Sequence, residues 1–312
     1  MKLLVLVPIK PNIEFIGRKK LFFLFSTILI LGSIALIAVR GLNLGIDFQG
    51  GIMMEVKVSE AGKLSEMRST LSQLNLGEVT LQEFGEPTDI LIRVQRQEGG
   101  EAAQQAALTR VREALGAGVE YRRTEFVGPQ VSQDLVRDGI LSVVLALGGI
   151  FAYVWFRYEW QFGVTGIIAL VHDMIAAVGF FALTDFEFNL SSIAAILTIA
   201  GYSVNDTVVV FDRVREQLRR YKAMPLPELF NNAINETLSR TVVTGITTLL
   251  AVGCLYIVGG EVIAGFSAAI IFGVFVGTFS SVCLAVPLLL HIKINRGVIA
   301  REPDAEKAAS RP

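Results

Sequence analysis

One apolar stretch carries two polar residues where a lipid-facing helix would carry Leu or Val. Asn205 and Asp206 interrupt a run that begins near Leu190 and is long enough to cross a bilayer. An Asp inside a membrane helix costs at least ~2.5–3.5 kcal/mol on insertion scales, so such residues usually face a bundle interior or a water-filled cavity. Asp206 is therefore a candidate proton- or ion-handling group in a transport bundle, with Asn205 beside it. The alternative is that Asp206 reaches the interface from the helix end and has no further role.

Arg240, at the start of a later apolar run, is the candidate partner of Asp206. The two residues are equally distant from residue 223, which lies in the segment Lys222–Pro227, where two prolines predict a helix break. If antiparallel arms flank the break, the two charges arrive at the same height and could pair. An arginine favours the charged carboxylate and desolvation favours the neutral one, so a balanced site could load and release a proton. The alternative for Arg240 is an interfacial anchor that contacts lipid phosphate.

A second pair of ionisable residues, His172 and Asp173, lies about ten residues into another apolar run. At 1.5 Å per residue, Asp173 is expected ~15 Å from the start of that span, near the middle of the bilayer. Asp173 therefore joins Asp206 and Arg240 as an ionisable group at membrane depth. The alternative for His172 is a packed, hydrogen-bonded core residue.

The composition places these residues in a membrane protein. The chain has 312 residues, of which 52% are hydrophobic and 18% charged, with a mean hydropathy of +0.55. A soluble protein of this size would be less apolar. The net charge of −1 says little about partners, and we expect no nucleic-acid partner. Cys254 and Cys283 both lie in apolar runs, so we predict neither a disulfide nor a metal site.

The N-terminal segment, residues 1–20, is basic and precedes an apolar run from Leu21 to Val39. A signal peptide shows the same order of features. This run is longer, however: at 1.5 Å per residue it reaches ~28 Å, which matches the hydrocarbon thickness of a bilayer, and no small-residue cleavage pattern is present. We interpret residues 21–39 as a retained transmembrane helix whose basic end is cytoplasmic.

Five further apolar runs, all within residues 139–290, complete a set of six transmembrane helices. We expect them at residues 139–156, 162–183, 190–211, 240–258 and 265–290. The remaining tail, residues 291–312, is polar and is expected to be disordered.

The charges of the loops predict the orientation of the chain. Lys and Arg are absent from residues 184–189 and 259–265. Residues 211–240 contain six of them, and residues 291–312 contain five. The positive-inside rule therefore places both termini and loop 212–239 in the cytoplasm.

Residues 40–138 have the composition of a soluble domain, which this orientation places outside the cytoplasm. Alternating and helical periodicities follow one another in the order βαββαβ, which is typical of the ferredoxin-like fold. The expected strands are 52–58, 79–84, 89–95 and 119–127, and the expected helices are 63–74 and 101–115. The domain shows no His cluster, Ser/His pairing or close carboxylates, so we expect a binding or mechanical module and not an enzyme.

Two glycine-containing motifs stand out. GLNLGIDFQGG, which begins at Gly41, allows tight turns and close backbone approach, and its spacing does not match a phosphate-binding loop. GVFVG, with Gly273 and Gly277, is a GxxxG pattern that would let two membrane helices approach closely. Pro287, near the end of the last run, is expected to relax or kink that helix.

Several motifs together resemble the SecF family, the smaller membrane subunits of the bacterial SecD–SecF protein-export complex. The resemblance extends over about residues 10 to 290 and is carried by GLNLGIDFQGG, VGPQVSQDLVRDG, RYEWQFG, LVHDMI, IAGYSVNDTVVVFDRVRE, LSRTVVTG and GGEVIAGFSAAIIFGVFVGTFSS. It implies one six-helix half of a resistance–nodulation–division (RND) bundle in the bacterial inner membrane, with SecD supplying the other half.

The resemblance also implies partners and residue roles. The complex would work beside the SecYEG channel, with YajC as a further candidate partner, and would use the proton motive force to pull or release the emerging polypeptide. Protons would be the coupling ion, and no other cofactor is implied. Asp206 would be the proton-responsive carboxylate and Arg240 its basic counterpart, with Asp173 as a support and Asn205 as a neighbouring candidate. A structural motif would join the first helix to the outer domain, through Gly45, Asp47, Phe48, Gly50 and Gly51.

Two alternatives from other classes stay open. A half-transporter for a lipid or small molecule requires a substrate-sized pocket among the helices or in a large outer domain. A non-transporting scaffold would use the polar residues only to hold helices together, through hydrogen bonds that average ~0.6 kcal/mol in one measured membrane protein.

Overall fold

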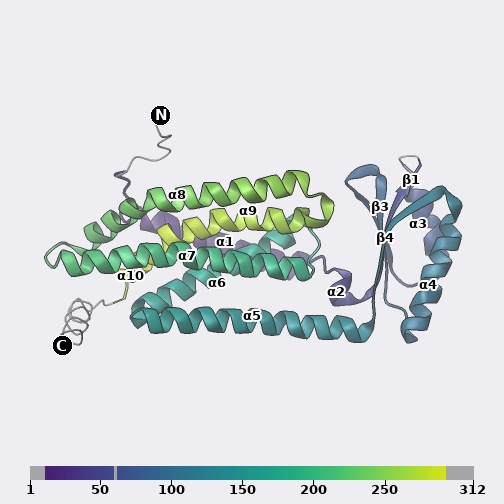
Figure 1. Cartoon of the computed structure of the whole chain (residues 1–312), viewed down its shortest axis with the longest axis horizontal. Coiled ribbons are helices and arrows are strands. Elements are labelled where there is room, and N and C mark those ends of the chain that lie inside the picture. Colours follow the sequence, from purple (N-terminus) through teal and green to yellow (C-terminus); the bar gives the residue numbers. More distant parts are fainter. Residues whose placement is uncertain (1–10, 60–61, 293–312) are drawn as a thin grey trace, which may run out of the picture. The chain divides into compact units, whose positions relative to one another are not determined.

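The computed structural model describes residues 11–59 and 62–292 (Figure 1). Within these ranges six helical segments are long and apolar enough to cross a membrane, which confirms the predicted number. They are α1 (Lys19–Arg40), α5 (Pro129–Arg157), α6 (Trp160–Thr184), α7 (Leu190–Arg220), α8 (Leu226–Val258) and α9 (Glu261–Ser280) with its continuation η2 (Ser281–Ala285) and α10 (Val286–Leu289). The tail for which disorder is predicted lies outside the described residues from residue 293 onward, as do residues 1–10.

Three helices extend beyond the apolar runs that predicted them. Helix α5 begins at Pro129 and not at residue 139. Helices α7 and α8 run through most of the predicted loop 212–239 and are separated only by residues 221–225, within the predicted break. Hydropathy identifies only the part of a helix that suits lipid, whereas backbone hydrogen bonding continues into water until the sequence breaks the helix. The predicted loop 212–239 therefore consists of the polar ends of two helices and the short connection between them.

The chain divides into two compact units. The helical unit contains the chain up to Gly41, Leu145–Asp185 and the chain from Ala194 onward. The α+β unit contains Leu42–Val144 and also Phe186–Ile193, which connect α6 to α7. The domain predicted at 40–138 is therefore completed by residues 186–193, which the sequence of residues 40–138 could not indicate.

In the helical unit, α9 packs against α6 and α8 and closely approaches α7. A Cβ atom added at Gly273 would lie 2.3 Å from Cγ1 of Ile199, and one at Gly277 would lie 3.2 Å from Cβ of Ser203. Only glycine leaves room for α7 at this distance. The GVFVG motif thus makes the close helix contact that its spacing predicts.

The α+β unit is a four-stranded antiparallel sheet with two helices on one face (Figure 1). Its strand order is β2-β3-β1-β4, and all three pairings are antiparallel, as in a ferredoxin-like fold. In chain order the elements are α2 (Ile46–Gln49), β1 (Gly51–Val58), α3 (Leu64–Ser72), β2 (Val79–Phe84), β3 (Glu86–Val94), α4 (Gly100–Leu115), η1 (Gly116–Gly118) and β4 (Val119–Val127). The predicted βαββαβ order is confirmed.

Alternation along the strands builds the core of this unit. Alternate side chains of β1, from Ile52 to Val58, are buried and lie in one apolar cluster with Leu71 of α3 and Val111 of α4. Burying an aliphatic side chain of this size contributes roughly 1.5–3 kcal/mol. Residues of three strands and two helices therefore share one core.

Candidate functional site

Asp173 on α6 is a fully buried carboxylate that is bonded through both oxygens. It is 1% exposed, and Nδ1 of His172 lies 2.8 Å from Oδ1. The hydroxyls of Ser203 on α7 and Ser280 on α9 donate to Oδ2 at 2.5 and 2.6 Å. Three helices therefore meet at one carboxylate, whose hydrogen-bond donors replace the water that burial removes.

Asp206 on α7 is also buried, at 2% exposed, but it is held loosely. Thr278 Oγ1 of α9 donates to Asp206 Oδ2 at 3.4 Å, and the hydroxyl of Tyr202 lies 3.3 Å from the same Thr278 oxygen. A donor–acceptor distance of 3.4 Å is near the outer limit of a hydrogen bond. Asp206 is therefore a buried carboxylate with weak support, which suits a group that changes its protonation state.

Hydroxyl groups of α7 and α9 fill the space between these helices. In addition to the contacts above, Thr207 Oγ1 lies 2.8 Å from Ser281 Oγ, and Ser281 Oγ donates to the carbonyl of Ser203 at 3.3 Å. Sequence analysis included Thr278–Ser281 only as the end of the motif GGEVIAGFSAAIIFGVFVGTFSS. Three hydroxyl residues within four positions of an apolar run were the signal that could have identified them.

A local change of helix type accompanies these hydroxyls. The last transmembrane segment changes from α-helix to a π-helical turn at Ser281, directly after Ser280, and Pro287 follows in α10. Single π-helical turns occur often at functional sites, because the extra residue redirects side chains. The irregularity predicted from Pro287 is present, and it begins six residues earlier in the chain, beside the Asp173 carboxylate.

Arg240 does not form the predicted ion pair with Asp206. It is exposed and lines an open cavity of about 830 Å³. Among the described residues no ion pair within 4.0 Å joins the two groups, although the guanidinium is close enough for its charge to act on Asp206. The physical reason is that Asp206 turns toward the hydroxyls of α9, whereas the long Arg240 side chain can stay in contact with water, where its charge is better solvated.

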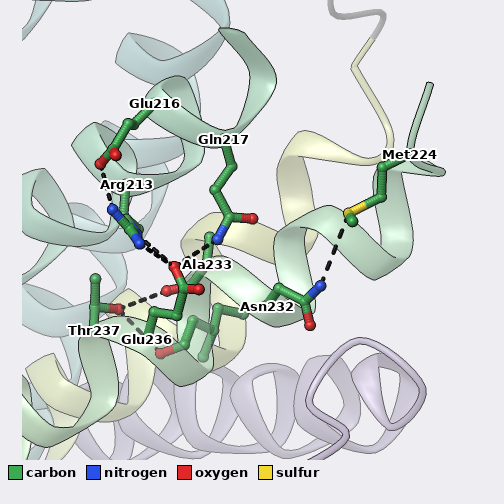
Figure 2. A network of polar contacts seen from close by, with 9 residues as sticks. Arg213, Glu216, Gln217, Met224, Asn232, Ala233, Glu236 and Thr237 are labelled. Atoms are coloured by element: carbon green, nitrogen blue, oxygen red, sulfur yellow. Dashed lines mark hydrogen bonds and ion pairs between the residues drawn. The ribbon is translucent and has the colours of Figure 1, made fainter. Parts of the chain in front are cut away.

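A polar network beside this cavity joins α7 to α8 (Figure 2). Arg213 donates to Glu236 Oε2 at 2.5 Å, Gln217 donates to the same oxygen at 2.7 Å, and Arg213 also donates to Glu216 at 2.5 Å. Glu236 is four residues before Arg240, so these two side chains share one face of α8. The network therefore fixes the spacing of the helices that carry Asp206 and Arg240.

Asn205 lies apart from this site. Its side chain is exposed, and it makes no hydrogen bond with another residue that the structure describes. Successive residues of an α-helix point about 100° apart, so burial of Asp206 turns Asn205 outward. The structure therefore gives no support to the prediction that Asn205 is part of a proton relay.

The GIDFQGG motif lies between α1 and β1, inside the α+β unit. Gly50 and Gly51 have φ angles of +71° and +125°, and a Cβ at Gly51 would lie 2.5 Å from the carbonyl oxygen of Val94. Glycine is required there because β1 begins directly against β3. Among the described residues no cluster of His, Cys, Asp and Glu could hold a metal ion, and Cys254 and Cys283 are free.

These features define a polytopic α-helical membrane protein with a ferredoxin-like domain and buried carboxylates between three of its helices. A family model described as the SecD/SecF GG motif matches residues 35–61, and a model of the C-terminal region of the protein export membrane proteins SecD/SecF matches residues 107–295. The chain belongs to the SecF family. The protein translocase subunits SecF of Rickettsia rickettsii and Rickettsia prowazekii are each 44% identical to it, over 95% of this chain and 98% and 96% of theirs.

Solved structures show the same fold. The crystal structure of SecDF, a translocon-associated membrane protein from Thermus thermophilus, matches with a TM-score of 0.82 and 32% identity, over 92% of this chain and 39% of that one. SecDF in its super-membrane-facing form matches with a TM-score of 0.66 and 31% identity, over 96% and 40%. The chain thus corresponds to about two fifths of the SecDF polypeptide.

Proposed function

We propose that this chain is an accessory subunit of the Sec protein translocase in the bacterial inner membrane, and that protons drive its work. It pairs with SecD, which supplies the other half of the bundle, and both of its termini are cytoplasmic. The complex acts beside the SecYEG channel, with YajC as a further partner, on unfolded polypeptide that emerges outside. Family membership and the two-fifths correspondence to SecDF support the pairing with SecD.

The single observation that carries the proton-driven role is the state of Asp206. Its carboxylate is 2% exposed, accepts a long hydrogen bond from Thr278, has the Tyr202 hydroxyl close by, and lies within electrostatic reach of Arg240. Burial favours the neutral carboxyl group and a nearby cation favours the charged one. Small helix movements that change the distance to Arg240 or to water would therefore load or release a proton, which makes Asp206 the proposed coupling residue.

Asp206→Asn tests this role, because it keeps the size of the side chain and removes its titration. We expect export and proton flux to fall to background in membranes that contain the complex with SecD. The matched control is Glu228→Gln, an exposed carboxylate at the start of α8, which should leave both unchanged. Normal export and normal proton flux in the Asp206→Asn membranes would contradict the proposal.

The two competing functions make different demands. A lipid or small-molecule transporter needs a substrate-sized pocket. The cavity of about 830 Å³ beside Arg240 is lined mostly by charged side chains, which suits no apolar substrate. The apolar pocket between α5, α6 and α7, lined by residues such as Leu170 and Phe211, has a volume of about 10 Å³. That volume barely holds one water molecule. A scaffold predicts that Asp206→Asn weakens assembly with SecD, which co-purification of the two subunits measures directly.

A further inference from the structure

The segment that leads into α7 is bound to the α+β unit through its backbone. Phe188 N–H donates to the carbonyl of Asn43 at 2.7 Å, and Gly45 N–H donates to the carbonyl of Phe188 at 2.9 Å. These two bonds make a parallel bridge between Leu44 and Phe188. The chain that follows α1 and the chain that precedes α7 are therefore paired, although they are far apart in the sequence.

Arg93 of strand β3 holds both of these segments with one side chain. Its guanidinium donates to Glu187 Oε2 at 2.5 Å and to Asn43 Oδ1 at 2.9 Å. The side chains of Arg93 and Glu187 are 18% and 21% exposed, so water screens the pair only in part. Charge-assisted hydrogen bonds in such surroundings are about twice as strong as neutral ones. The centre of the sheet is thereby linked to the start of α7.

The carboxylate of Asp47 completes this link at the helix itself. Its Oδ2 accepts a hydrogen bond of 3.0 Å from the N–H of Leu190, the first residue of α7. The first N–H groups of a helix have no partner within the helix, and a negative charge there is favourable. On the neighbouring residue, the carbonyl of Phe48 accepts a 2.8 Å bond from Ser132, in the first turn of α5. One short motif thus binds the beginnings of two membrane helices.

Gly45 shows that this arrangement is built into the motif. A Cβ atom at Gly45 would lie 2.3 Å from Oε1 of Glu187 and 3.2 Å from Cβ of Asn189. Any other residue would push Glu187 away from Arg93. The glycine is therefore needed for the ion pair, and its place in GIDFQGG follows from packing and not from binding a phosphate.

We propose that Asn43, Asp47, Arg93, Glu187 and Leu190 form a joint, here called the α7 joint, that carries movements between the α+β unit and the helix that bears Asp206. Arg93 and Glu187 are its positioning residues. The inference rests on the proposed function, since it explains how a proton taken up by Asp206 does work on a polypeptide. Helix α7 runs unbroken from Leu190 to Arg220, so Asp206 lies on the same continuous helix as Leu190, the one joint residue within α7.

The test breaks the ion pair in the complete complex with SecD in membrane vesicles. In Arg93→Gln, hydrogen–deuterium exchange at residues 186–193 should become about tenfold faster, as expected for a segment that loses its charge-assisted bonds. Export should fall by a similar factor. Carbodiimide labelling of Asp206 should stay unchanged, because the proton site itself is intact.

Two further variants separate coupling from general damage. Lys57→Gln breaks the exposed Lys57–Glu86 ion pair on the same sheet and should leave export and exchange at wild-type values. The exchanged pair Arg93→Glu with Glu187→Arg should restore both readouts, which a purely local defect would not allow. If Arg93→Gln fails to accumulate, Arg93→Lys, which keeps the positive charge but lacks the guanidinium fork that bonds Glu187 and Asn43 together, takes its place.

The outcomes for the α7 joint and for the proposed function are distinct. Faster exchange with unchanged export, or unchanged exchange, would overturn the joint and leave the role of Asp206 standing. Normal export in Asp206→Asn overturns the proton-driven function whatever Arg93 does. Loss of export in Arg93→Gln and in Asp206→Asn, with recovery of export in the exchanged pair, supports both the α7 joint and the proton-driven function.

Discussion

The behaviour of a buried carboxylate depends on how many donors support its charge. Asp173 has three close partners, His172, Ser203 and Ser280, at 2.5–2.8 Å. Asp206 has a bond of 3.4 Å from Thr278 and the Tyr202 hydroxyl beside it. Close hydrogen-bond donors stabilise one protonation state of a carboxylate, whereas a carboxylate with weak hydrogen bonds can change its protonation state more easily. At the scale of single residues the two acids therefore differ in how firmly they are held, as their proposed roles require.

Removing the acceptor at Asp173 should destabilise the helical unit. Asp173→Ala leaves the two serine hydroxyls and His172 without their partner in a buried site, which should cost about 3 kcal/mol. Asp173→Asn keeps an acceptor oxygen and should lose less. Thermal denaturation of the purified complex in detergent measures both, and equal melting temperatures for the two variants would contradict this reading.

Among the helical elements, the contact between α7 and α9 depends on the absence of side chains. Gly273 and Gly277 bring α9 close enough to α7 for the hydroxyl of Ser281 in η2 to donate to the backbone carbonyl of Ser203. The hydroxyl of Ser203 in turn donates to the Asp173 carboxylate of α6. The polar site is thus a consequence of small residues on one helix face. A bulkier face would separate the hydroxyls from the carboxylates.

Gly273→Ala tests this packing. Its Cβ would lie 2.3 Å from Ile199, so the substitution should cost about 1–3 kcal/mol through overpacking and lower the melting temperature. Gly253→Ala is the matched control, because no atom lies within 4 Å of a Cβ at that position of α8. Adding Ile199→Ala to Gly273→Ala should recover part of the loss, and no recovery would argue against a steric cause.

At the scale of the whole molecule, the two units share continuous helices, and the α7 joint lies where α7 enters the α+β unit. Glu187 gives this joint a dependence on pH. Burial raises the pKa of Glu187 above its ordinary value of 4.5, against the opposing effect of Arg93, and the carboxylates of Asp47 and Glu125 raise it further. The closed joint therefore binds a proton more tightly than an exposed glutamate does.

The sign of this effect follows from linkage. A raised pKa in the closed state means that the contribution of Glu187 to stability is complete below pH 4.5 and is lost as pH rises through the raised value. We expect the protection factors of amides at residues 186–193, which are corrected for the intrinsic pH dependence of exchange, to rise as the outer side is acidified through this window. In Glu187→Gln the pH dependence of these protection factors should disappear, and an unchanged profile in that variant would assign the effect to another group.

Local patterns were sufficient for much of this architecture. The six apolar runs, the βαββαβ order and the GxxxG spacing each depend on residues close in the sequence, and each prediction was confirmed. Hydropathy alone did not show that most of residues 212–239 is helical, because it does not report polar helix. Asp206 and Arg240 were expected to pair because they are equally distant from one helix break. Equal distance fixes the positions of the two residues along antiparallel helices, but not the directions in which their side chains point.

The sequence by itself determined that Asp173 and Asp206 lie in apolar runs long enough to cross a membrane, because length and hydropathy are local properties of the chain. Only the tertiary structure decided their partners: Thr278 is 72 residues from Asp206, Ser280 is 107 from Asp173, and Glu187 is 94 from Arg93. Contacts of this kind are set by the packing of whole helices and of a sheet against a distant loop. No local periodicity encodes them.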